Sequence, residues 1–160
     1  MRRILRRLRD TSGTSIVEAA IITPLLLLLT LSIVDFGVLF YVYLALENGV
    51  SQATRFAVTG NLMDDPSNPG TNLSRDDSIK LAMRQATPTL TIPDSAFTFS
   101  SMDPGGAGWS AGSGGPNQLA KVSVNYSWTF INPMLWAFFT GGQITLNVES
   151  AMKNEGAPPS

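Results

Sequence analysis

A long apolar run near the N-terminus constrains this chain more than any other feature. Residues 19–34 carry no charge, Asp35 interrupts the run, and residues 36–46 are again uncharged. A helix that crosses a bilayer needs about 20 mostly apolar residues. A soluble core helix would show polar residues at helical spacing on one face, whereas the leucines at 25–29 leave no polar face. The run therefore predicts a membrane-spanning helix.

The charges on either side of the run predict its orientation. Five arginines and one acid, Asp10, precede Gly13, while the rest of the chain holds six basic and eleven acidic residues. Positive flanks stay in the cytoplasm, so we expect a cytoplasmic N-terminus and an extracytoplasmic domain after Leu46. A secretory signal is the alternative, but the run exceeds a signal core of roughly 7–15 residues and no clear A-x-A site follows. The arginines are too local to predict a nucleic-acid surface.

Composition argues against most enzymes. The chain has no cysteine and no histidine, which excludes disulfides, zinc sites built on these residues and triads with a histidine base. The acidic loop at 63–72 lacks EF-hand spacing, and the glycine-rich loop at 103–117 lacks a phosphate-binding motif. No spacing pairs the carboxylates for acid–base chemistry. We expect no catalysis, no metal and no cofactor.

The remaining pattern predicts an α+β domain at residues 61–155, followed by a disordered tail at 156–160. The membrane helix should continue to about residue 60, because Leu46, Val50, Ala53 and Ala57 form an apolar stripe at helical spacing. This stripe packs on the soluble domain or, alternatively, on a helix of another subunit. Ser74 predicts the N-cap of a short helix that ends before Pro88.

Strict alternation of apolar and polar residues predicts the sheet. Residues 121–130 and 144–152 both alternate, which is typical of strands with one packed face, and 97–99 predicts a further short strand. The connection between the two longer strands, INPMLWAFFTGG at 131–142, is too short to cross a membrane. Its apolar side chains cap the core, dip into the outer leaflet or contact a partner through Trp136, Phe138 and Phe139.

Two residues inside the apolar run are unusual there. Pro24 removes one helix hydrogen bond and favours a kink, which membrane helices tolerate. Asp35 is costly in lipid, by about 2.5–3.5 kcal/mol at the bilayer centre and less near the surface. We interpret Asp35 as an interfacial residue at the outer headgroups or, alternatively, as a contact to a partner helix.

A glutamate lies close to the start of the apolar run, at a fixed spacing from a glycine and a basic leader. Glu18 is the fifth residue after Gly13, and the arginine leader precedes them. This arrangement is similar to a class III (type IV prepilin) signal. The resemblance implies that a prepilin peptidase cuts between Gly13 and Thr14, and that Glu18 meets the freed amine of a neighbouring subunit. On physical grounds alone, Glu18 is also explained as an interfacial acid that favours the helix dipole.

The segment SGTSIVEAAIITPLLLLLTLSIVDFG narrows the resemblance to TadE-like proteins, minor pseudopilins of the tight-adherence (Flp) pilus system. Glu18, Pro24, the leucine tract and Asp35-Phe36-Gly37 follow the family pattern in order. Ala19 departs from it, since many such signals carry an aromatic residue there. The resemblance implies a leader at 1–13, a helix at 14–60, and a pilin-like assembly subunit in the bacterial inner membrane. Its partners would be the peptidase, other pilin subunits and the assembly machinery. The alternative is an uncleaved single-span protein with a periplasmic binding or adhesion domain.

Overall fold

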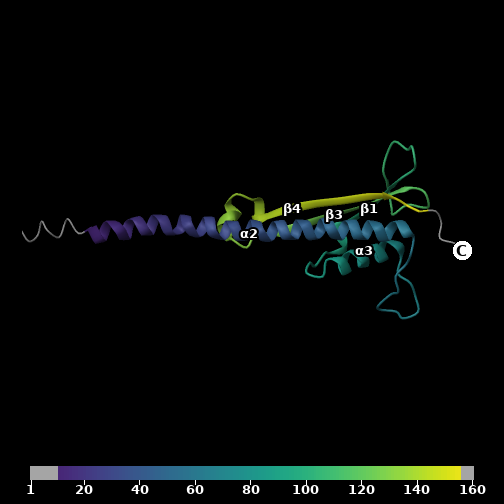
Figure 1. Cartoon of the computed structure of the whole chain (residues 1–160), viewed down its shortest axis with the longest axis horizontal. Coiled ribbons are helices and arrows are strands. Elements are labelled where there is room, and N and C mark those ends of the chain that lie inside the picture. Colours follow the sequence, from purple (N-terminus) through teal and green to yellow (C-terminus); the bar gives the residue numbers. More distant parts are fainter. Residues whose placement is uncertain (1–10, 156–160) are drawn as a thin grey trace, which may run out of the picture. The chain divides into compact units, whose positions relative to one another are not determined.

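The computed structural model of the chain describes residues 11–155 and confirms the α+β class. Within these residues, one long helix, one short helix, three 3-10 turns and four strands follow one another along the sequence (Figure 1). They are α2 (Thr11–Thr59), α3 (Arg75–Ala86), η1 (Asp94–Ala96), β1 (Phe97–Met102), β2 (Ser110–Ala111), β3 (Leu119–Thr129), η2 (Pro133–Ala137), η3 (Thr140–Gly142) and β4 (Gln143–Lys153).

These elements fall into two compact units, and α2, β3 and β4 each contribute to both. Among the described residues, the first unit contains 11–38 and 129–143, and the second contains 39–128 and 144–155. The first unit therefore joins the apolar half of α2 to the connection between β3 and β4.

The apolar stripe of α2 forms one side of the core in the second unit. Leu46, Val50, Ala53 and Ala57 are all buried, as is Val42 one turn earlier. Thr54, also on the buried face, donates a hydrogen bond to the backbone oxygen of Ser150 in β4 at 3.4 Å. The packing of this stripe on the chain's own sheet confirms the simpler of the two interpretations made from sequence.

Helix α3 has the start that the sequence predicts. The hydroxyl of Ser74 accepts a hydrogen bond from the backbone N–H of Asp77, which is N-capping. The helix buries Ile79 and Met83, four residues apart on one face, and ends at Ala86, two residues before Pro88.

The sheet is antiparallel, with strand order β2-β1-β3-β4. In β3, Val122 and Val124 are buried as the alternation predicts, and in β4 Val148 is the fully buried residue. Strand β1 is longer than the predicted 97–99, because its end pairs with both β3 and the short β2. Strand β2 lies within residues 103–117, which the sequence predicted as a loop throughout.

A glycine of α2 permits close packing of α3. A Cβ built on Gly49 would lie 2.5 Å from Thr87 Cγ2 and 3.3 Å from Met83 Cγ. Both neighbours are buried, and the β-branched Thr87 side chain has little freedom to move. Gly49 therefore sets how closely α2 approaches the end of α3.

We predict that Gly49→Ala lowers the free energy of unfolding by about 1–3 kcal/mol, because overpacking outweighs the gain in helix propensity. Thermal unfolding of the full chain in detergent, followed by near-ultraviolet circular dichroism, measures this. Gly37→Ala is the matched control, since a Cβ at Gly37 meets nothing within 4 Å. An unchanged or raised melting temperature for Gly49→Ala would contradict the packing described.

A group of ion pairs links α3 to the turn that precedes β1. Arg84 and Asp94 form one pair, Arg84 also donates to the backbone oxygen of Ile92 at 3.0 Å, and Lys80 lies 2.8 Å from Asp77. The hydrogen bond from Arg84 lowers the pKa of Asp94, and the hydrogen bond from Lys80 lowers the pKa of Asp77. Both carboxylates therefore favour the folded state only while they are ionised.

Because both carboxyl pKa values are lowered, their stabilisation is complete above the unfolded value of about 4 and is lost as the pH falls through the folded values. We expect the melting temperature to be flat from about pH 7 to 5 and to fall by a few degrees at most below pH 4, since these groups are exposed. In Asp94→Asn the melting temperature should fall less at acid pH, because the carboxyl at position 94 no longer titrates. An identical acid decline in Asp94→Asn would show that the Arg84 pair contributes nothing.

Candidate functional site

The N-terminal half of α2 presents apolar side chains outward on every side. Within residues 11–155, Gly13–Thr59 is the helix long and apolar enough to cross a membrane. Its apolar side chains are largely exposed, for example Ile16 at 70% and Ile33 at 73%. In water such a surface would be strongly unfavourable, whereas in lipid it is the expected one.

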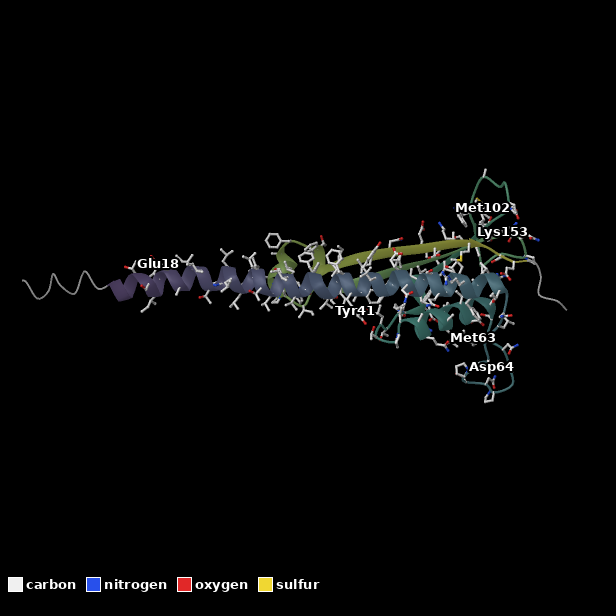
Figure 2. All side chains as sticks on the ribbon, viewed as in Figure 1. Glu18, Tyr41, Met63, Asp64, Met102 and Lys153 are labelled. Carbon is white, nitrogen blue, oxygen red and sulfur yellow. The ribbon has the colours of Figure 1, made fainter. Side chains whose placement is uncertain are left out.

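Glu18 projects from the N-terminal turns of this apolar surface (Figure 2). Its side chain is exposed, as are Gly13 and Thr14 at the expected cleavage point. A Cβ built on Gly13 would meet nothing within 4 Å. The described part of the chain therefore leaves the carboxylate of Glu18 and the Gly13–Thr14 bond accessible to another molecule.

Asp35 has a role that sequence reasoning missed. The residue is only 1% exposed, although it lies in the apolar half of α2. One carboxylate oxygen accepts the backbone N–H of Ile131 at 3.1 Å, and the other accepts that of Asn132 at 2.7 Å. The carboxylate thereby holds the first residues of the β3–β4 connection. This contact lies within the chain and is neither of the two contacts considered from sequence, while the expected position of Asp35 at the outer headgroups stays a prediction.

The aromatic residues of the same unit pack around this contact. Phe36, the residue after Asp35, meets the buried Phe130 edge to face, with ring centroids 5.9 Å apart. The ring of Phe139 also packs on Phe130, with ring centroids 4.4 Å apart. The indole N–H of Trp136 donates to the backbone oxygen of Phe130 at 2.9 Å. Asp35 and Phe36 thus fix the end of β3 against α2.

The connection at 131–142 divides into buried and exposed residues. Leu135 is buried and Phe139 is partly buried, so the predicted core cap is present. Phe138 is 75% exposed, however, and Trp136 is 51% exposed. Of the three residues expected to contact a partner, Trp136 and Phe138 are exposed and Phe139 is partly buried.

Glu18, Pro24 and Asp35 follow one another along α2, in the part of the helix whose apolar side chains are exposed. Residues 13–55 match the TadE-like protein family. The match confirms the resemblance over these residues, which include Glu18, Pro24, the leucine tract and Asp35-Phe36-Gly37. No curated protein and no solved structure matches the chain. The TadE-like segment also includes most of the buried stripe of α2, so it contributes to both compact units.

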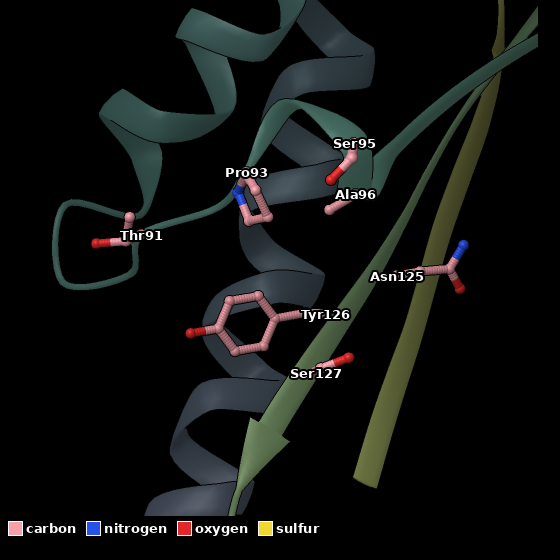
Figure 3. A pocket seen from close by; sticks show the side chains of 7 residues that line it. All are labelled: Thr91, Pro93, Ser95, Ala96, Asn125, Tyr126 and Ser127. Atoms are coloured by element: carbon pink, nitrogen blue, oxygen red, sulfur yellow. The ribbon is translucent and has the colours of Figure 1, made fainter. Parts of the chain in front are cut away.

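Outside the segment that matches the family, a shallow cavity of about 300 Å³ lies between residues 91–96, which precede β1, and residues 125–127 of β3. Figure 3 shows Pro93 and Tyr126 facing this space, whereas Asn125 points away from it. The amide of Asn125 instead accepts a hydrogen bond from Asn147 of β4 at 2.7 Å. The residues that line it include no Asp, Glu, Lys or Arg.

Carboxylates elsewhere in the described residues are not gathered for metal binding. Within residues 11–155, no three acidic side chains come together in a way that could hold an ion. In the loop at 63–72, the carboxylate of Asp65 accepts a hydrogen bond from the backbone N–H of Ser67 at 2.8 Å. The backbones of Asp64 and Asn72 form an isolated antiparallel β-bridge. These contacts are typical of a polar turn.

Proposed function

We propose that this chain is a minor pilin-like subunit that acts in assembly of a tight-adherence pilus and catalyses no reaction. The single observation that carries the proposal is an exposed apolar helix with an accessible carboxylate near its start, within the segment that matches the TadE-like family. The helix anchors the protein in the inner membrane. The N-terminus lies in the cytoplasm and the sheet domain lies outside, with helix burial against other subunits supplying the affinity.

Processing is the second part of the proposal. A prepilin peptidase cleaves between Gly13 and Thr14, which removes the arginine leader and leaves a charged amine close to Glu18 in sequence. In lipid a carboxylate and an ammonium each carry a high desolvation cost, which pairing between adjacent subunits offsets. Because the pair forms only when two helices are correctly staggered, it sets their register.

Intact mass spectrometry of the protein from its native membrane tests this processing. We expect a mass that corresponds to residues 14–160 when the peptidase is present and the full mass when the peptidase is absent. Gly13→Phe is a matched variant that should retain the leader, since a bulky side chain replaces the glycine at the cleavage point. A full-length mass in both strains would contradict the proposal and favour an uncleaved single-span protein with a binding domain.

A further inference from the structure

We propose that the exposed apolar part of the β3–β4 connection inserts into the lipid bilayer, at the boundary between headgroups and acyl chains, on the same side of the membrane as the sheet. The connection then acts as a second, interfacial anchor beside the membrane helix. This inference rests on the proposed membrane span of α2, but it does not depend on cleavage or on pilus assembly.

The depth of the connection follows from its attachment to α2. A span of about 20 residues, or roughly 30 Å at 1.5 Å per residue, that begins at Ala19 ends at Val38. Asp35 lies three residues before that end, so it lies near the outer boundary of the hydrocarbon layer. Since Asp35 binds the backbone of Ile131 and Asn132 directly, the connection is held at the same depth.

The backbone of the connection is suited to a medium that offers few hydrogen-bond partners. Irregular backbone is costly in lipid because each unpaired polar group costs several kcal/mol. Most backbone N–H groups in this connection donate a hydrogen bond within the chain. They are those of Ile131, Asn132, Met134, Leu135, Phe138, Phe139 and Gly142. The carboxylate of Asp35 accepts two of these hydrogen bonds. An apolar side chain at position 35 would leave both N–H groups without this acceptor.

The exposed surface of the connection is apolar. Ile131, Met134, Trp136 and Phe138 are between 46% and 75% exposed. The one polar atom of the Trp136 side chain donates to Phe130 of the same chain, so its exposed ring edge has no hydrogen bond to satisfy. Tryptophan is enriched at membrane interfaces. A clustered apolar surface of this kind is unfavourable in water.

A small apolar cavity lies where the connection meets α2. It measures about 110 Å³ and is lined by Leu31, Val34, Asp35, Ile131, Asn132 and Pro133. The lining of this cavity is almost wholly apolar. An acyl chain is therefore a more favourable occupant of the cavity than water.

Depth-dependent quenching in vesicles tests the proposal. Because the chain has no cysteine, a single Phe138→Cys variant of the full chain can be labelled with a small environment-sensitive fluorophore. The labelled protein is placed at low density in phosphatidylcholine vesicles that carry bromine on acyl carbons near the headgroup or near the methyl end. Leu27→Cys reports the membrane span, and Ser67→Cys, in the exposed polar loop, reports water.

We expect headgroup-proximal bromine to quench the label at position 138 about two-fold or more over the label at position 67. Methyl-end bromine should quench position 27 most. Adding Asp35→Ala should reduce quenching at 138 and leave 27 unchanged. Quenching at 27 without quenching at 138 would overturn the interfacial anchor while the span stands, and absence of quenching at both would overturn the span itself. A label at 138 that is shielded from water but insensitive to bromine would assign the surface to a protein partner and overturn the lipid assignment.

Discussion

Glu18→Ala should reduce association of this chain with other pilus subunits by about 100-fold or more. The estimate follows from the cost of removing one partner of a buried ion pair, about 3–5 kcal/mol, since the amine left behind stays buried and unpaired. Membrane insertion should be unaffected, because the apolar run at 19–34 does not depend on Glu18. The measurement is the amount of chain that co-purifies with pilus subunits from detergent-solubilised membranes, relative to the amount in the membrane.

Two further variants separate charge from shape at this position. Glu18→Asp keeps the charge on a shorter side chain and should retain part of the association. Glu18→Gln keeps the length and a hydrogen-bond acceptor but loses the charge, so it should resemble Glu18→Ala. Normal association of both Glu18→Gln and Glu18→Ala would remove the role of Glu18 in setting the register.

Asp35→Ala should have the largest effect on folding of the first unit. The substitution leaves the N–H groups of Ile131 and Asn132 without their acceptors, at 3.1 and 2.7 Å in the native chain. Hydrogen bonds to charged groups contribute about 1.5–3 kcal/mol each, so the loss is about 3 kcal/mol or more. Backbone amides in 130–143 should then exchange hydrogen roughly 100-fold faster.

Hydrogen–deuterium exchange of the full chain in detergent measures this loss, with peptides from α3 as an internal reference. Asp35→Asn is the matched control, because its amide offers one acceptor oxygen and should give an intermediate increase. If exchange in 130–143 changed by less than about threefold in Asp35→Ala, the two hydrogen bonds would not hold the connection.

Sequence reasoning predicted those elements whose signal is local. Leu46, Val50, Ala53 and Ala57 recur at helical spacing, and all four are buried. The alternation from Lys121 to Phe130 likewise predicted a strand that the structure places at Leu119–Thr129. Local patterns of this kind are set by which face of an element is buried, and that information is present in a short window of sequence.

The contacts of Asp35 could not be predicted in this way. Its partners, Ile131 and Asn132, are 96 and 97 residues distant in sequence, and backbone N–H groups carry no sequence signal. The sequence offered only an indirect indication of this contact. A carboxylate in an apolar helix needs hydrogen-bond donors, and the position of residues 131–142 was left open between three interpretations. The division of that connection into a buried Leu135 and an exposed Phe138 likewise depends on tertiary packing.

The most direct test of the assembly proposal is zero-length cross-linking of native membranes with a lipid-soluble carbodiimide, which joins a carboxylate to an amine in contact with it. Peptide mass spectrometry then identifies the joined residues. We predict an amide bond between the Glu18 carboxylate of this chain and the N-terminal amine of another processed subunit, absent in Glu18→Gln. Recovery of unmodified Glu18 in a chain that still begins with the arginine leader would contradict the account.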